Sequence, residues 1–570
     1  MLKLTTKLLA CTIFAMPASL MAQSTEDQTA SDTKGGLDVI VVTAQKRAEG
    51  LSDVPISIAA VAGESLAAAS TDSLQDLSGS VPNLLITQSG ITSEIGVRGV
   101  YSGGNKGFEQ SVGMFVDGIY YGRDQFIRLP LLDLERVEVL RGPQPTLFGK
   151  NAIAGAVSIT TAKPTDEFEA KFSALYEPEH EEKQFTGIIS GPLGDDGFMA
   201  RVTASYREMD GFMRNVTLNR DEASLEETYV RAQLGYEGDA PISFLLKAEY
   251  AKFDSAGRNI ENYGPVGNYS AVFAGPLFVD TTLDYQRQGN GSNSLNDAFV
   301  SSLNVNFDLG SDYTLTSTTG FITYDTTELI DVDFTGLSLL DGTSQGEDFD
   351  QFSQELRITS PGGETLDFIA GLYYQSQKLK VTDSVKFNPF FLATPFAAIG
   401  DTTNERFYKQ SADTYSAFAQ ATWNATDRLS ITAGARYNHE VKTGSRDLSF
   451  TAGPLNTGFM TPSPVPAFAT LGHLTFAALN IEEHSIAGRR KENSFNPIAN
   501  IQYEATDNIN LFASFSRGTK AGGFDIRGNS LPTSMTVAVP ATFQFEEETA
   551  TNFEGGIKAR WYNADFNITY

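Results

Sequence analysis

The chain from about Phe168 onward alternates apolar and polar residues with a period of two. In the segment 415–423, one face carries Tyr415, three alanines and Trp423, while serine, glutamine and threonine occupy the other face. Successive side chains of a strand point to opposite faces, so this pattern predicts many β-strands with two unlike faces. A soluble sandwich alternates in the same way, and the strands alone therefore leave a sandwich and a barrel open.

The connections between these segments favour a membrane barrel. Long excursions are expected at 254–296, 382–409 and 439–492, and short turns at 192–197, 238–241, 310–312, 360–364, 424–427 and 505–508. Because short and long connections alternate, an antiparallel sheet would place all the long loops at one end, as outer-membrane barrels do. Aromatic residues at strand ends, such as Trp423, Tyr437 and Tyr503, suit the two interfacial girdles.

The segment from Pro55 to about Lys163 has a mixed pattern instead. It predicts short helices at 64–69 and 73–77, the second opened by a Thr71-Asp72 cap, and strands at 84–87, 95–98, 112–116 and 136–140. Asp117-Gly118 between two apolar runs is typical of a tight hairpin. These elements are enough for one small α+β domain ahead of the barrel.

The N-terminus has the form of a secretion signal, with a basic start, an apolar run at 8–16 and a cleavage position at Ala22. Cys11, the single cysteine, lies inside it, so the mature chain would have neither disulfides nor thiolate metal sites. The polar stretch 23–36 then gives way to an apolar patch at 38–44. Such a patch can add as a strand to the sheet of another protein, or it can be the first strand of the next domain.

Charge and composition exclude several classes of protein. Of 570 residues, 42 are Lys or Arg and 70 are Asp or Glu, which gives a net charge of −28. A nucleic-acid binder needs a basic face, so this balance argues against one. With 41% hydrophobic and 11% aromatic residues, the chain can bury a large apolar surface and is not low-complexity sequence. The excess acid is assigned to a polar lumen and to outer loops.

The sequence contains no arrangement of residues that indicates an enzyme. The four histidines, His180, His439, His473 and His484, lack the spacing of a metal site, and no nucleophile elbow is present. The run 148–151 (FGKN) matches only the end of a phosphate-binding loop and has the wrong glycine spacing upstream. No catalytic residue, metal site or cofactor is predicted.

Several motifs, in their order along the chain, resemble those of the TonB-dependent outer-membrane receptors. They are DVIVVTAQKR at 38–47, SVPNLLI at 80–86, IGVRGV at 95–100, MFVDGIYYGR at 114–123, LERVEVLRGPQPTLFGKNAIAGAVSITTAKP at 134–164, FSQELRITS at 352–360, FASFSRGTKAGGF at 512–524 and EEETATNFEGGIKA at 546–559. Two residues depart from the usual pattern, Pro145 and Ala154, each where the family has glycine. Both lie on loops of the α+β domain, which leaves the fold prediction intact.

The resemblance implies a mainly β fold, with an N-terminal α+β plug inside a transmembrane antiparallel β-barrel. The expected divisions are a signal peptide at 1–22, a periplasmic leader at 23–50, the plug at 51–163 and the barrel at 164–570. The family barrel has about 22 strands, of which about 15 are expected here. Both barrel ends should be periplasmic, yet 565–570 stops midway along a strand, so we expect an N-terminal fragment that does not insert alone.

The resemblance also implies active uptake. TonB, energised by its inner-membrane complex, would pair with the TonB box and pull on the plug; the box is Asp38, Val39, Ile40, Val41, Val42, Thr43 and Ala44. A monomer in the outer membrane of a Gram-negative bacterium is expected, in contact with lipid and lipopolysaccharide. Ferric siderophore is the favoured ligand. Cobalamin, a glycan, an aromatic compound or a passive porin-like barrel are the alternatives.

Charged and aromatic residues supply two further hypotheses. The resemblance implies a charge lock between plug and wall, formed by Arg98 and Arg141 with Glu355 and Glu554; the alternative is solvated lumen charge. The second hypothesis is a ligand contact on the apex loops of the plug, where the alternative is exposed loop tips. Its candidates are Tyr101, Phe108, Tyr120, Tyr121 and Arg123.

Overall fold

The computed structural model describes residues 41–43, 45–47, 49–51, 54–88, 93–261, 282–289, 291–331, 340–387, 402–452, 481–537, 539–561 and 564–569. The expected signal peptide and Asp38, Val39, Ile40 and Ala44 of the box lie outside these residues. No helix in the described ranges is both long and apolar enough to span a bilayer.

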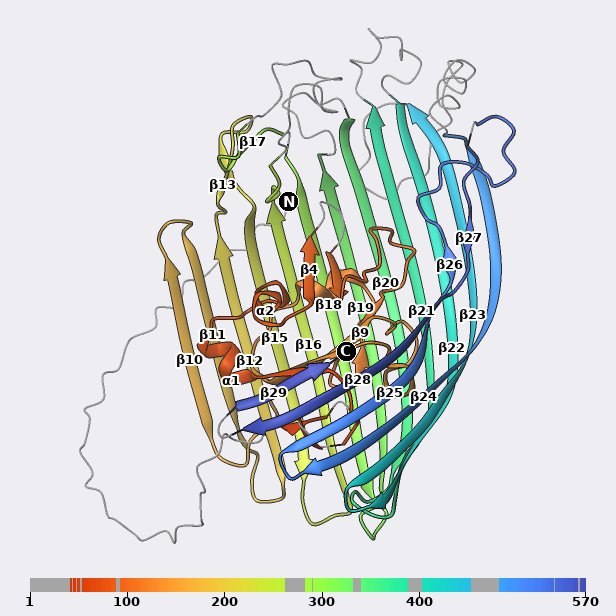
Figure 1. Cartoon of the computed structure of the whole chain (residues 1–570). Helices are drawn as coiled ribbons and strands as arrows, with labels where there is room; N and C mark the ends of the chain where they lie inside the picture. Colours follow the sequence, from red (N-terminus) through yellow and green to blue (C-terminus); the bar gives the residue numbers. More distant parts are fainter. Residues whose placement is uncertain are drawn as a thin grey trace, which may run out of the picture.

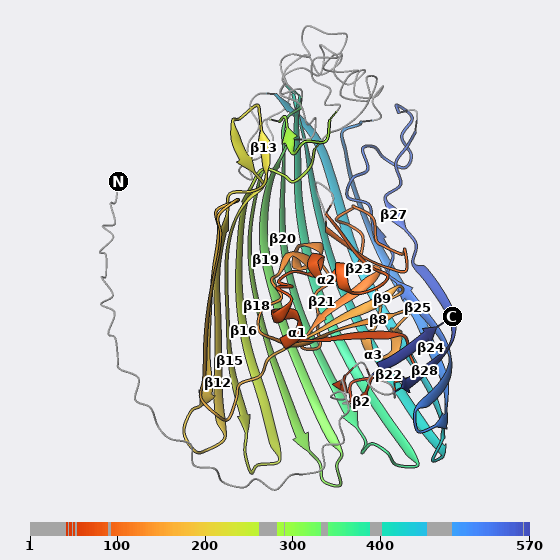
Figure 2. The same ribbon diagram turned by 60° about the vertical axis from the view of Figure 1, so that its left-hand side comes forward.

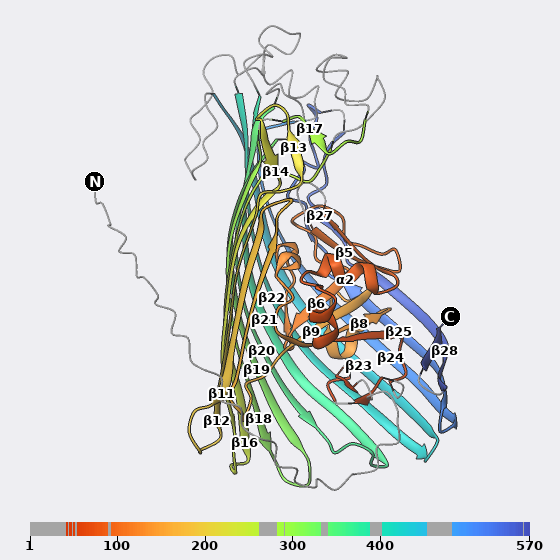
Figure 3. The same ribbon diagram turned by 90° about the vertical axis from the view of Figure 1, so that its left-hand side faces the viewer.

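A single antiparallel sheet of 15 strands forms the wall, with neighbours in chain order from β10 to β29. This agrees with the expected number of strands. The sheet curves around the plug, and its two edge strands, β10 and β29, do not pair with each other in the described part (Figures 1 and 3). The strands are β10 (Glu169–Glu177), β11 (Glu182–Pro192), β12 (Phe198–Met209), β15 (Ser224–Glu237), β16 (Ile242–Ala256), β18 (Asn293–Asp308), β19 (Thr314–Ile330), β20 (Leu340–Thr359), β21 (Leu366–Phe387), β22 (Thr402–Thr426), β23 (Leu429–Ala452), β24 (His484–Thr506), β25 (Ile509–Lys520), β28 (Glu548–Trp561) and β29 (Ala564–Thr569).

The two faces of this wall are the reverse of those in a soluble sheet. On β15, Val230 is 38% exposed on the outer face, while the neighbouring Arg231 is 1% exposed on the inner face. On β28, Phe553 is exposed and Glu554 is buried, as the alternation predicts. An apolar outer face and a polar inner face fit a sheet surrounded by lipid, and they exclude the sandwich alternative.

Short and long connections are segregated to the two ends of the wall, as predicted, except that the short turn at 178–181 between β10 and β11 lies at the end with the long connections (Figure 1). The excursions expected at 382–409 and 439–492 are too long, however. Strand β21 continues to Phe387 and β22 begins at Thr402, while β23 continues to Ala452 and β24 begins at His484. The backbone hydrogen-bond ladders of β21 with β22 and of β23 with β24 continue beyond the segments in which one face is apolar. The alternation of apolar and polar residues in the sequence therefore ends before the strands do.

The plug is built on a five-stranded sheet with the order β3-β8-β9-β6-β7. Strand β6 ends at Val116 and β7 begins at Ile119, and Asp117 and Gly118 between them have φ of 50° and 82°, which confirms the tight hairpin.

Helix α2 is capped by Ser73, whose oxygen accepts from the Asp76 N–H; the expected Thr71-Asp72 cap is therefore wrong by one position. The departure at Pro145 begins helix α3, where proline's missing N–H costs nothing. The plug elements are β3 (Ile58–Ala62), α1 (Gly63–Ala68), α2 (Leu74–Ser80), β4 (Leu84–Gln88), β5 (Ser93–Val97), β6 (Val112–Val116), β7 (Ile119–Tyr120), the 3-10 helix η1 (Asp124–Arg128), β8 (Leu134–Arg141), α3 (Pro145–Phe148) and β9 (Gly155–Thr161).

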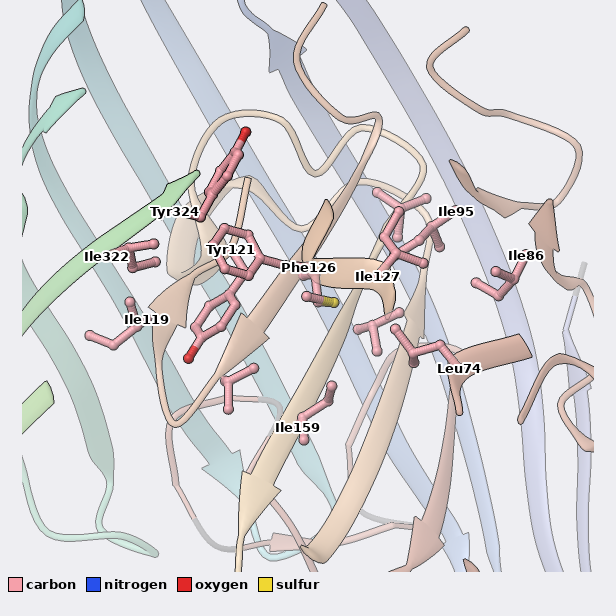
Figure 4. Close-up of a cluster of buried hydrophobic side chains, with 14 of the residues drawn as sticks. Leu74, Ile86, Ile95, Ile119, Tyr121, Phe126, Ile127, Ile159, Ile322 and Tyr324 are labelled. Atoms are coloured by element: carbon pink, nitrogen blue, oxygen red, sulfur yellow. The ribbon is translucent and has the colours of Figure 1, made fainter. Parts of the chain in front are cut away.

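The main hydrophobic core lies inside the plug and continues to the wall. Leu74, Ile95 and Ile159 pack in the plug interior, and Ile322 and Tyr324 of β19 join them from the wall side (Figure 4). The plug therefore contacts the inner face of the wall through apolar as well as charged groups. Short strands complete the fold: β1 (Val41–Val42) with β2 (Glu49–Gly50), β13 (Met213–Asn215) with β14 (Arg220–Glu222) and β17 (Gln286–Arg287), and β26 (Gly523–Phe524) with β27 (Gln544–Phe545).

Candidate functional site

The described part of the predicted TonB box is docked against the plug. Val41 and Val42 form β1, which pairs with β2, and Val42 is fully buried while Val41 is 47% exposed. The Thr43 N–H donates to Glu138 Oε1 of β8 at 2.7 Å. Within the described residues β1 pairs on one edge only, so its second edge offers backbone groups to another strand.

The segment that follows the box is anchored to the wall. The Arg47 guanidinium donates to Pro361 O at 3.0 Å, to Ser360 Oγ at 3.0 Å and to Phe368 O at 2.9 Å, all around the turn between β20 and β21. This places the box at the end of the wall that carries the short turns.

The structure brings together two of the four residues expected in the charge lock. Arg98 Nη1 lies 3.1 Å from Glu554 Oε2, with the Glu554 side chain 4% exposed. Arg141 lies beside this pair but donates within the plug, to Pro82 O at 2.9 Å. Burial and the neighbouring Arg98 lower the pKa of the Arg141 guanidinium.

Glu355 belongs to a different cluster, which corrects its expected pairing with a plug arginine. It accepts from Arg357 on its own strand at 2.7 Å and faces Lys46 of the leader. Burial lowers the pKa of Lys46, although Glu355 acts in the opposite direction. The reason is topological, because β20 and β28 lie on separate parts of the wall and only β28 reaches Arg98.

Three of the five expected ligand contacts are buried between plug and wall. Arg123 Nη2 lies 2.5 Å from Glu347 Oε1 of β20, the Tyr121 hydroxyl donates to Glu249 Oε2 at 3.1 Å, and Tyr120 packs in the plug. Their exposed fractions are 7% or less. The prediction of direct ligand contact is therefore wrong for Tyr120, Tyr121 and Arg123. The tight hairpin and the turn after it aim these side chains at the wall.

The other two candidates, Tyr101 and Phe108, lie on the apex of the plug. Tyr101 is 59% exposed. Phe108 is half-buried, and its ring packs edge-on against Phe545 with centroids 4.9 Å apart. These two aromatic groups stay candidates for ligand contact.

The segment 521–545 folds inward over this apex (Figure 2). Asn105 Nδ2 donates to Asp525 Oδ1 at 2.7 Å, and a Cβ on Gly107 would lie 2.3 Å from Phe524 O. The Arg446 guanidinium of β23 donates to Asp525 O at 2.7 Å and to Ser530 O at 3.0 Å. The run AGGF at 521–524 ends one of the family-like motifs. Nothing in the alternation of apolar and polar residues predicts that the chain turns into the lumen there.

Buried ion pairs join plug and wall at sites that the sequence did not indicate. Asp117 pairs with Lys247, Asp133 with Arg201, Lys106 with Glu347, Glu109 with Lys442, and Lys150 with Glu440. The wall residues of these pairs occupy polar positions, which the alternation places on the inward face of the strands. No sequence signal specified which plug residue each would meet. Among the described residues, no group of three His, Cys, Asp or Glu side chains is arranged to hold a metal ion.

The comparisons with known proteins cover nearly the whole chain. Residues 50–156 match the TonB-dependent receptor plug domain, and residues 236–570 match the TonB-dependent receptor-like β-barrel. The pesticin receptor of Yersinia enterocolitica is 23% identical over 97% of this chain and 72% of its own length. An iron-regulated outer membrane virulence protein of Vibrio cholerae is 30% identical over 41% of this chain and 37% of its own.

Solved structures with the same fold include the ferric yersiniabactin uptake receptor of Yersinia pestis. It superposes with a TM-score of 0.71 at 19% identity, over 90% of this chain and 71% of the receptor. The siderophore receptor PiuA of Acinetobacter baumannii superposes with a TM-score of 0.67 at 14% identity, over 91% of this chain and 72% of the receptor. With its plug, its inverted wall and these matches, the chain belongs to the family of TonB-dependent receptors.

Proposed function

We propose that this protein takes up a ferric siderophore across the outer membrane of a Gram-negative bacterium, driven by TonB. One observation carries the proposal: the match to the pesticin receptor runs through 97% of the chain, plug and wall together. The solved relatives that bind or take up siderophores share the fold over about the same span. No catalytic role is proposed.

The docked TonB box supports the energy input. Strand β1 has a free edge in the described part, and TonB would pair with it as an added strand. Arg47 anchors the segment behind the box to the wall, so a pull on the box would act on the contacts between plug and wall. The outer membrane with its lipid and lipopolysaccharide surrounds the apolar outer face. The working unit proposed is a monomer.

The apex of the plug supports the ligand class. Tyr101 of the plug presents exposed aromatic surface, and Phe108 packs against Phe545 of the inward segment, with the buried amine of Lys520 5.8 Å from the Phe108 ring centre. Aromatic rings and cations suit an anionic or aromatic iron chelate by stacking and charge.

Growth under iron limitation tests the function. A strain lacking the gene is complemented with the intact gene or with a variant lacking the codons for residues 38–44, and both are supplied with ferric yersiniabactin, ferric enterobactin or ferripyoverdine. We expect one ferric siderophore to restore growth with the intact gene and none to do so without the box. Failure of all three ferric siderophores to restore growth would reject the iron cargo, and equal rescue without the box would reject the dependence on TonB.

A further inference from the structure

Three cavities lie in line between the plug and one part of the wall, here called the β15–β19 sector and formed by β15, β16, β18 and β19. The outer cavity, about 260 Å³, opens near the long connections and is lined by Ser224, Phe253 and Ser294. The inner cavity, about 370 Å³, lies at the other ends of the same strands and is lined by Gly235, Phe244 and Asn304. A third cavity of about 30 Å³ lies between them.

Shared lining residues make these cavities one series. Pro130 lines both the outer and the middle cavity, and Ile159 and Thr161 line both the middle and the inner cavity. The middle cavity, the smallest of these three, is lined mainly by plug residues, with Tyr229, Arg231 and Glu249 from the wall. It lies among strands that have both neighbours in the sheet, away from the edges β10 and β29.

A layer of buried ion pairs lies between the middle and the inner cavity, since Arg231 and Glu249 line the middle cavity and Asp117 lines the inner cavity. Lys247 Nζ lies 2.6 Å from Asp117 Oδ2 of the plug and 3.2 Å from Glu249 Oε2. Arg231 Nη1 lies 3.8 Å from Glu249 Oε1, and its Nη2 donates to Leu132 O of the plug at 2.5 Å. The side chains of Lys247 and Arg231 are each 1% exposed. Charged groups suit a contact that must open, because hydration by water offsets much of the free energy lost when the ions separate. Apolar surfaces gain no favourable hydration when they separate.

The plug side of this layer is linked to the TonB box. Asp117 is carried by the two-residue turn between β6 and β7 and also accepts from the N–H and hydroxyl of Thr161, so a shift of this turn together with the end of β9 would separate it from Lys247. A Cβ on the adjacent Gly118 would lie 3.9 Å from Lys46 Nζ. Thr43, Lys46 and Asp117 all line the inner cavity. Movement of the leader would therefore change the inner cavity and the turn that carries Asp117.

We propose that the ligand passes the plug along the β15–β19 sector, and that Lys247, Asp117, Glu249 and Arg231 form the gate of this route. The proposal rests on the uptake function above and names the route and its regulation. Asp117 acts from the plug, and Lys247, Glu249 and Arg231 act from the wall. The hairpin between β6 and β7 is the moving part.

The gate is tested without any ligand, so a failure of the proposed siderophore uptake would not affect the result. The full chain carrying Cys11→Ser and Leu131→Cys is refolded in detergent; Leu131 lines the middle cavity and is 7% exposed. The measurement is the rate at which this cysteine reacts with a trimethylammonium methanethiosulfonate. We expect Lys247→Ala to raise the rate by about tenfold or more, because local opening becomes easier.

Three further variants separate a gate from general loosening. Lys247→Arg keeps the charge and should leave the rate within about twofold of the parent, and Arg406→Ala, which breaks its pair with Asp383 on another part of the wall, should do the same. If Lys247→Ala does not fold, Asp117→Asn removes the same pair from the plug side and should raise the rate. An unchanged rate in the folded Lys247 or Asp117 variant, or an equal rise in Arg406→Ala, would overturn the proposed route.

Discussion

The plug meets the wall in two ways. In the β15–β19 sector, ion pairs lie between cavities, and one hairpin supplies Asp117. In the second contact, here called the β22–β25 sector, helix α3 and the residues after it interlock directly with strands β22 to β25. There Lys442 Nζ lies 3.0 Å from Glu109 Oε1, 3.0 Å from Glu440 Oε1 and 2.8 Å from Gly522 O.

The difference concerns how each contact would respond to force. Around α3, backbone groups also take part: the Asn151 N–H donates to Thr519 O at 2.9 Å, and the Ala521 N–H donates to Asn151 Oδ1 at 3.0 Å. Breaking that contact exposes backbone and side-chain groups together, whereas Asp117 and Lys247 meet through their side chains. The β22–β25 sector therefore suits a fixed support, and the β15–β19 sector suits a movable closure.

The largest expected effect is on stability and belongs to the fixed support. Lys442→Met leaves Glu109 and Glu440 buried without their shared cation, so the free energy of unfolding should fall by ~3–5 kcal/mol. Urea unfolding of the refolded chain in detergent measures it. Lys380→Met, at a side chain that is 63% exposed, is the control and should change stability by less than ~0.5 kcal/mol. Equal effects of the two substitutions would remove the contrast between the sectors.

Acid should weaken the same support in a defined pH window. Burial alone would raise the pKa of Glu109, but Lys442 and Lys150 hold it at about 2. A carboxyl with a lowered pKa stabilises the fold fully above its unfolded pKa of about 4.3, and this contribution is lost as pH falls towards its folded pKa. The stability difference between the parent chain and Glu109→Gln should therefore be constant from pH 7 to about pH 5 and shrink below that. A constant difference down to pH 3 would contradict the assignment.

Loss of the Arg98–Glu554 pair should have an intermediate effect. Arg98 is about one third exposed, so we expect Glu554→Ala to lower stability by only about 1 kcal/mol while loosening the plug. In cells with normally assembled receptor, entry of a large antibiotic should increase. Glu355→Ala is the matched control, because Glu355 contacts no arginine of the plug in the described structure. Unchanged permeability with Glu554→Ala would reject the lock.

The smallest effect is expected at the mouth of the outer cavity. Ser73 caps α2 and lines that cavity, so Ser73→Ala should cost ~0.5 kcal/mol through the lost N-cap. The same urea titration measures this cost. Ser73→Asp retains a capping oxygen and should stay near the parent, whereas a loss as large as that of Ser73→Ala would contradict the capping role.

Much of the fold follows from local patterns. The alternation at Val230-Arg231 and at Phe553-Glu554 identifies the outward and inward faces, because the strand period fixes each side chain relative to its neighbour. Asp117-Gly118 specifies its hairpin because a two-residue turn requires positive φ at both positions. The ends of β23 and β24 were missed, because both faces carry polar residues there, as in 442–447, and the apolar–polar alternation is lost although the inward Lys442 and Arg446 stay buried.

The sequence alone was sufficient for the plug, the inverted wall and the number of strands, all of which depend on residues near one another in the chain. Pairings across the lumen were decided only by the folded chain. Arg98 meets Glu554 and not Glu355, and Asp117 meets Lys247, because the order of strands around the wall determines which inward charge faces each plug loop. The sequence marks an inward charge but does not show which plug residue it will face. Only the place of its strand around the wall distinguishes Lys442, in the fixed support, from Lys247, in the proposed gate.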